Sequence, residues 1–127
     1  MDEEGSRRAR FDGEWVHLVA YKGVSPEADD VMRQSFPMRP DAASITARAI
    51  RDCAPVQIHD VTLDADYGPK EAAARAGYRS NLAVPLLKDG RVLGSIAACR
   101  AEPGPFPDKQ VKLLQTFADQ AVIAIEN

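Results

Sequence analysis

Residues 82–99 place two apolar runs on either side of an Asp-Gly pair, and this pattern restricts the fold more than any other stretch of the chain. The runs are residues 82–87 and 92–99, and Asp89 and Gly90 lie between them. Asp-Gly readily adopts the positive φ angles of a tight type I′ turn, so the stretch predicts a β-hairpin. Both runs are apolar at nearly every position, so both faces of the sheet should be covered here.

Two further strands are predicted upstream of the hairpin. Residues 14–21 follow the turn signal Asp12-Gly13 and are rich in β-branched and aromatic residues. Residues 56–58 form a short strand before a polar stretch. Within the hairpin, Pro85 has no N–H to donate to a ladder, so we expect a bulge or an unpaired position there.

Four helices complete the predicted order of elements. The first runs to about residue 34, with Ser25 as its cap and Pro26 in its first helical position. The second covers residues 41–53, where apolar residues recur at helical spacing on one stripe. The third covers residues 69–75 and ends at Gly77, and the last starts at Pro107.

The last helix is apolar on more than one side. Its core stripe is predicted from residues three and four positions apart: Val111, Leu114, Phe117, Ala118, Ala121, Val122 and Ile125. Leu113, Ile123 and Ala124 lie outside this stripe, so the last two turns are apolar almost all round. A helix with this pattern is either fully buried or packed against a partner.

Composition narrows the class of protein. A chain of 127 residues with 45% hydrophobic and 28% charged residues is typical of one globular domain. It has neither a run of about 20 apolar residues nor a signal-peptide core, so we expect a cytoplasmic domain without membrane contact.

The charged residues and the cysteines exclude further classes. Arg7, Arg8 and Arg10 form the one short basic run, beside acidic residues, and are interpreted as a solvated terminus without nucleic-acid binding. Two cysteines, Cys53 and Cys99, predict no disulfide and suit a reducing compartment.

Several segments together resemble a GAF domain. The resemblance covers nearly the whole chain, from Phe11 to Asn127. The segments that carry it are Phe11-Asp12-Gly13, Ser44 at the start of a helix, Pro55-Val56, residues 58–61, 77–86 and 103–106, Asp89-Gly90, Leu93-Gly94 and residues 117–127. Residues 77–86 and 117–127 look especially similar to GAF domains that precede bacterial histidine kinase or nucleotide cyclase modules.

The resemblance implies an α+β, PAS-like GAF fold. Such a domain has a central antiparallel sheet of five or six strands, with the terminal helices on one face and short helices and loops over a ligand pocket on the other. Residues 11–127 would form the domain, and residues 1–10 a polar segment at which the family's opening helix is expected to be missing. The last helix would lead into an output module of the same polypeptide.

The implied function is non-catalytic, in a bacterial signal-transduction protein. We expect the domain to sense an unknown small molecule, to form a homodimer, or both, with the signal passed through the C-terminal helix. The helix residues assigned to the dimer and the signal are Leu113, Ile123, Ala124 and Ile125. A ligand-free dimerising spacer is one alternative. The other is a free methionine sulfoxide reductase with Cys99 activated by Arg100 and resolved by Cys53.

The candidate pocket residues come from the predicted sheet and its roof. They are His17, Ile45, Ala49, Tyr67, Tyr78, Ser80, Leu82, Ser95 and Ala97, with Asn81 as a further polar candidate. Strand alternation places Ser80 and Leu82 on one face and Asn81 on the other, so these residues cannot all line one pocket.

We expect no cofactor and no metal, because the motifs that would bind them are missing. The Asn-Lys, Phe and Asp-Glu pattern of cyclic-nucleotide sites is absent, as is the Cys-His pair that attaches a bilin. His17 and His59 are weak candidates for haem ligands, in a strand and a strand-end loop. No closely spaced pair of cysteines or histidines indicates a zinc site.

Overall fold

The computed structural model describes residues 4–22 and 26–126, and within them five strands form one antiparallel sheet. The strand order across the sheet is β2-β1-β5-β4-β3. The strands are β1 (Glu4–Phe11), β2 (Val16–Lys22), β3 (Val56–Ile58), β4 (Ser80–Lys88) and β5 (Arg91–Arg100). The expected α+β architecture, with a five-stranded antiparallel sheet at its centre, is confirmed.

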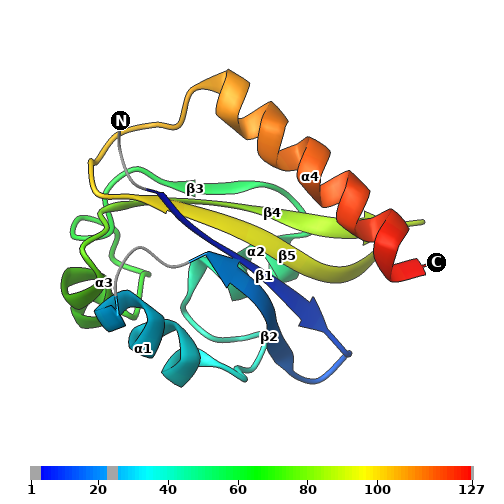
Figure 1. Cartoon of the computed structure of the whole chain (residues 1–127), viewed down its shortest axis with the longest axis horizontal. Coiled ribbons are helices and arrows are strands. Elements are labelled where there is room, and N and C mark those ends of the chain that lie inside the picture. Colours follow the sequence, from blue (N-terminus) through cyan, green and yellow to red (C-terminus); the bar gives the residue numbers. More distant parts are fainter. Residues whose placement is uncertain (1–3, 23–25, 127) are drawn as a thin grey trace.

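Helices cover both faces of this sheet (Figure 1). They are α1 (Pro26–Ser35), α2 (Ile45–Asp52), α3 (Lys70–Ala76) and α4 (Asp108–Glu126). The long helix α4 packs on β4 and β5 from one side, and α2 packs on β3, β4 and β5 from the other. Helices α1 and α3 lie against each other on the α2 side. Within the described residues, α4 is the one terminal helix on its face, where the resemblance implies two.

The β4–β5 hairpin forms as predicted. Asp89 and Gly90 have φ angles of 51° and 79°, the positive values that a type I′ turn requires. The irregularity expected at Pro85 lies instead between Leu86 and Leu87. Pro85 stays in register on β5, and β3 pairs with β4 only as far as Ala83, so the missing N–H breaks no ladder bond on that side.

Both faces of the hairpin are buried, also as predicted. All residues from 80 to 86 are buried, and they alternate between two apolar layers. One layer joins Leu82, Val84, Leu86 and Ile96 to Leu114, Ala118 and Ala121 of α4; the other joins Ala83 and Ala97 to Ile45 and Ala49 of α2. Each fully buried Leu or Val stabilises the fold by roughly 1.5–3 kcal/mol, so the two layers hold the helices to the sheet.

Strand β1 is the largest departure from the sequence prediction. Residues 4–10 belong to the segment predicted to be a polar, solvated terminus, yet Glu4–Phe11 pairs with both β2 and β5. Arg7 is only 8% exposed. Backbone hydrogen bonds on both edges place this segment inside the sheet despite its polar side chains, because strand formation depends strongly on pairing partners.

Most other boundaries agree with the predictions to within a few residues. Helix α3 ends at Gly77, whose φ is 84°, and β3 has the predicted bounds. Strand β2 starts two residues late, because the Asp12 carboxylate accepts hydrogen bonds from the backbone N–H groups of Glu14 and Trp15 and holds them in the loop. The predicted cap at Ser25 lies outside the described residues.

Helix α2 is shorter than the predicted helix of residues 41–53. It begins at Ile45 because Ser44 caps it: the Ser44 Oγ accepts a hydrogen bond from the backbone N–H of Ala47 at 3.2 Å. At the other end, Cys53 adopts a left-handed conformation with φ of 52°. Both ends are therefore fixed by local capping geometry.

The predicted core stripe of α4 is partly wrong. Leu114, Ala118 and Ala121 are buried, but Phe117 is 51% and Ile125 42% exposed. A helix that lies on one face of a sheet buries only the stripe that touches it, and no described element covers the other side of α4. None of the helices in the described ranges is long and apolar enough to cross a membrane.

The close approach of β1 to β5 gives a first prediction. A Cβ atom at Gly94 would clash with the backbone carbonyl oxygen of Ala9 on β1. The substitution Gly94→Ala should therefore lower the free energy of unfolding by about 3 kcal/mol, because backbone has to move. Gly90→Ala, in an open turn at positive φ, should cost about 1 kcal/mol. Chemical denaturation measures both values, and equal losses would contradict the prediction.

Candidate functional site

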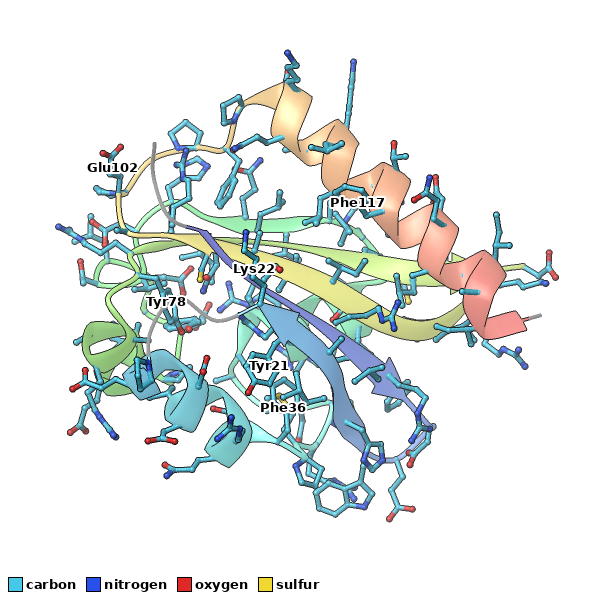
Figure 2. The ribbon with its side chains drawn as sticks, in the orientation of Figure 1. Tyr21, Lys22, Phe36, Tyr78, Glu102 and Phe117 are labelled. Atoms are coloured by element: carbon cyan, nitrogen blue, oxygen red, sulfur yellow. The ribbon has the colours of Figure 1, made fainter. Side chains whose placement is uncertain are left out.

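Five polar side chains gather between the sheet and the helices on the α2 side. They come from β1, α2, β4 and the segments on either side of α3, and we call them the polar cluster: Arg7, Thr46, Tyr67, Tyr78 and Asn81. Arg7 is 8% exposed, and Thr46, Tyr67 and Asn81 are 3% exposed or less. Tyr78 is half-buried and lies on the α1 and α3 side of the sheet (Figure 2).

Hydrogen bonds join the members of the polar cluster into two separate groups. Arg7 Nε donates to Thr46 Oγ1 at 2.9 Å. The hydroxyls of Tyr67 and Tyr78 share a short hydrogen bond, and Asn81 Nδ2 donates to the Tyr67 hydroxyl at 3.4 Å. The first bond joins β1 to α2, and the other two join β4 to the segments on either side of α3.

The register of the sheet explains why these residues meet. Arg7 lies opposite Ala97 of β5, and Ala97 lies opposite Ala83 of β4, so the three residues form one row across the strands. Asn81 lies two positions before Ala83 and therefore on the same face. The short side chains of Ala83 and Ala97 in this row allow α2 to pack closely on the sheet through Ile45 and Ala49.

The environment of Tyr67 keeps its hydroxyl protonated. Burial raises the pKa of Tyr67 far above its ordinary value, and the neighbouring Tyr78 hydroxyl raises it further. The positive charge of Arg7 and the hydrogen bond from Asn81 act in the opposite direction but are weaker. Tyr67 therefore acts as a neutral hydrogen-bonding group throughout the physiological range.

Asn81 is incompletely satisfied. Its side chain is fully buried, and its Oδ1 atom has no hydrogen-bond partner among the described residues. A buried polar atom left without a partner costs about 1–3 kcal/mol. Such atoms are rare in folded proteins and call for an explanation.

Most of the predicted pocket residues lie on this face. Ile45, Ala49, Tyr67 and Ala97 share one apolar cluster, and Tyr78 packs against it. Ser95 Oγ donates to the backbone oxygen of Thr46 at 3.2 Å and belongs to the same side.

Three predicted residues lie elsewhere. Leu82 faces α4, in line with strand alternation. Ser80 Oγ donates to the Glu102 carbonyl and accepts from Arg100, at the start of the connection to α4. His17 bonds the Asp12 carboxylate at 2.8 Å in the exposed β1–β2 hairpin. None of the three contributes to the polar cluster.

Arg7 and Thr46 are the cluster members that the sequence reasoning missed. A usable signal exists for Arg7: Asp12-Gly13 is a turn that precedes a predicted strand, and such a turn implies a partner strand before it. Alternation along that partner would place Arg7 beside Gly5 and Ala9 on one face. Thr46 lies one residue after the predicted pocket residue Ile45, and no local pattern distinguishes it.

The two cysteines of the reductase alternative lie in different environments. Cys53 is exposed at the end of α2, and Cys99 is buried on the side of β5 that faces α2. Arg100 extends to the opposite face, where its guanidinium lies 4.3 Å from the centroid of the Phe106 ring. In the described ranges, no group of three or more His, Cys, Asp or Glu side chains is placed to hold a metal ion.

A second surface feature is a groove of about 510 Å³ beside α4. Leu113, Leu114 and Phe117 of α4 form one wall, and residues at the start of β1 and the end of β2, among them Ser6 and Lys22, form the other. Figure 2 labels Phe117 and Lys22 on the two walls. Leu113 and Phe117 are both more than half exposed, so α4 presents apolar surface here.

Comparison with known proteins identifies the family. The family model described as GAF domain matches residues 2–126. Comparison with curated proteins gave no match. A domain of a two-component sensor histidine kinase protein from Sinorhizobium meliloti is 19% identical over 98% of this chain and 78% of that chain, with a TM-score of 0.73.

Two further solved structures have TM-scores of 0.79. The GAF domain/HD domain protein from Geobacter sulfurreducens is 18% identical over 96% of this chain and 79% of that chain. The type II free methionine-R-sulfoxide reductase from Thermoplasma acidophilum is 15% identical over 98% of this chain and 80% of that chain. At these identities the likeness shows a shared fold and not a shared activity.

The raised pKa of Tyr67 predicts the behaviour of the protein in alkali. Above about pH 10 an unfolded tyrosine loses its proton whereas folded Tyr67 keeps it, so stability falls as the pH rises. This group alone should contribute a slope of about 1.4 kcal/mol per pH unit. In Tyr67→Phe the free energy of unfolding should fall less steeply by that amount, as measured by denaturation from pH 9 upward. Parallel curves for the two proteins would refute the assignment.

Proposed function

The chain belongs to the GAF domain family, and on this premise we propose that it is a sensory and regulatory module of a cytoplasmic bacterial signalling protein. A small molecule binds at the polar cluster, and α4 passes the signal to an output module. The sensor histidine kinase domain among its structural neighbours supports this type of role.

One observation carries the proposal: the same two strands bear the polar cluster on one face and α4 on the other. Asn81 faces the cluster, and its neighbour Leu82 faces α4. Cores are closely packed, so a strand that shifts on one side must shift on the other. A ligand that favours one arrangement of the cluster thereby favours one position of α4.

The connection between β5 and α4 supports the same route. Arg100 donates to the Gly104 carbonyl at 2.9 Å and to the Pro105 carbonyl at 3.2 Å. The backbone N–H of Phe106 donates to Gln57 Oε1 of β3 at 2.9 Å. The start of α4 is therefore bound to three strands, since Arg100 also donates to Ser80 of β4.

The exposed side of α4 supports association into a homodimer. Leu113 and Ile123 are more than half exposed, Ile125 is 42% exposed, and Ala124 is exposed beside them. Exposed apolar residues near the end of the proposed signalling helix suit a helical seam between two copies.

Two alternatives compete with sensing. A ligand-free dimerising spacer would use the α4 surface alone and would have no role for the unsatisfied atom of Asn81. A free methionine sulfoxide reductase is represented among the structural neighbours. The placement of Arg100 and Cys99 on opposite faces of β5 favours sensing over this enzyme.

Native mass spectrometry of the freshly purified protein tests the sensory function. We expect a retained non-covalent mass of small-molecule size that is released on denaturation. We expect this mass because Asn81 Oδ1 has no hydrogen-bond partner among the described residues, and a bound molecule could donate a hydrogen bond to it. A protein that carries no additional mass would instead support the spacer.

Sedimentation velocity tests the role of α4. The double substitution Ile123→Lys and Ile125→Lys places two charges in the proposed seam and should shift the protein from dimer to monomer. Leu63→Lys is the matched control, because Leu63 is 82% exposed and lies outside α4. If the doubly substituted protein stays dimeric, α4 is not the seam.

A further inference from the structure

Arg7 is a mostly buried arginine without a counter-charge among the described residues. It is only 8% exposed, yet its single hydrogen bond within the described residues is from Nε to the neutral hydroxyl of Thr46. Two other arginines differ: Arg48 pairs with Asp64 at 3.4 Å and Arg79 with Asp60 at 2.5 Å. Among residues 4–22 and 26–126, no carboxylate lies within ion-pair distance of Arg7.

This arrangement is unusual for a mostly buried arginine. Buried charges are normally paired, and a buried charge without a partner destabilises the folded state. The two terminal nitrogens of the guanidinium have no acceptor among the described residues, and they are not among the fully buried atoms without a partner, so they remain accessible to a ligand.

Asn81 supplies an independent observation at the same site. Its Oδ1 atom is a buried acceptor without a donor, and its Nδ2 atom is already bound to Tyr67. The charge of Arg7 acts on that same Tyr67 hydroxyl, so Arg7 and Asn81 border one region of the polar cluster. The region thus offers a forked cationic donor and a neutral acceptor, both unused.

We propose that the polar cluster binds a small carboxylate that also carries a hydroxyl or an amine. The carboxylate accepts two hydrogen bonds from the terminal nitrogens of Arg7, and the hydroxyl or amine donates to Asn81 Oδ1. This inference rests on the proposed sensory function and names the chemical class of its ligand.

The site favours a carboxylate over a phosphate for two reasons. The planar guanidinium fork matches the two oxygens of a carboxylate in bidentate geometry. One arginine also balances the single charge of a carboxylate, whereas a phosphate dianion would leave a negative charge buried.

The test compares Arg7→Met with Arg8→Met. Arg8 is the next residue of β1 and faces the opposite side of the sheet. Arg8→Met is therefore a matched control, because it removes one positive charge from the same strand without changing the polar cluster. Without added ligand, Arg7→Met should have a melting temperature no lower than that of the wild type, because it removes an unbalanced buried charge. Arg7→Lys keeps the positive charge but lacks the planar guanidinium group. This variant replaces Arg7→Met in the binding test if the Met variant does not fold.

The probes are L-lactate and L-serine at millimolar concentration, each measured by its shift of the melting temperature. Propionate lacks the donor and lactamide lacks the charge, so both should bind at least about tenfold more weakly than lactate. Lactate and serine should stabilise the wild type and Arg8→Met alike. Binding to Arg7→Met or Arg7→Lys should be at least about tenfold weaker.

Each other result overturns the inference in a different way. A sharp loss of stability in Arg7→Met, with no response of the wild type to either probe, would make Arg7 a structural residue. A neutral compound or inorganic phosphate that stabilises the wild type, where lactate and serine do not, would refute the carboxylate and leave sensing intact. If the wild type neither retains a molecule in native mass spectra nor responds to any probe, the proposed function fails as well.

Discussion

Burial of β4 and β5 on both faces is the constraint on which the rest of the structure depends. Alternate residues of these strands pack against α2 on one side and α4 on the other, so neither helix can shift without disturbing the pair. The edge elements are added to this centre: β3 pairs with β4, and β1 brings β2 to the other side. The two apolar layers therefore share the backbone hydrogen bonds of one hairpin. A shift of this hairpin would affect both the α2 side and the α4 side of the sheet.

The polar cluster is held in place by apolar packing more than by its own hydrogen bonds. Ile45, Ala49 and Tyr67 pack around it, while Arg7 and Asn81 keep unused hydrogen-bonding groups in its interior. An arrangement of this kind lowers stability, and proteins retain it mainly at functional sites, where a strained or incomplete region is needed for activity. The rigid hairpin supplies the stability that such a region lacks.

Much of the fold follows from local sequence signals, and the exceptions have physical reasons. The local signals are the turn at Asp89-Gly90, the cap at Ser44 and the helix end at Gly77. Each acts over a few residues, so the hairpin could be predicted, and the bounds of α2 and α3 could be predicted to within a few residues. Strand β1 could not be assigned from its own side chains, because its place depends on pairing with β2 and β5. Most of the inner-face residues were predictable for the same local reasons, whereas the burial of Arg7 is a consequence of that non-local pairing. The exposure of Phe117 likewise depends on which elements cover α4.

The attachment of α4 to the sheet is uneven along its length. Arg100 and Gln57 bind the chain just before the helix, and the apolar contacts with the sheet end at Val122, beyond which Ile123 and Ile125 are exposed. The 19 residues of α4 span about 28 Å, so the helix resembles a lever whose fulcrum lies near Phe106. A tilt of about 4° at that fulcrum displaces the far end by about 2 Å, a distance comparable to the helix shifts by which many proteins switch state. Small shifts of the hairpin are in this way enlarged at the end of the helix.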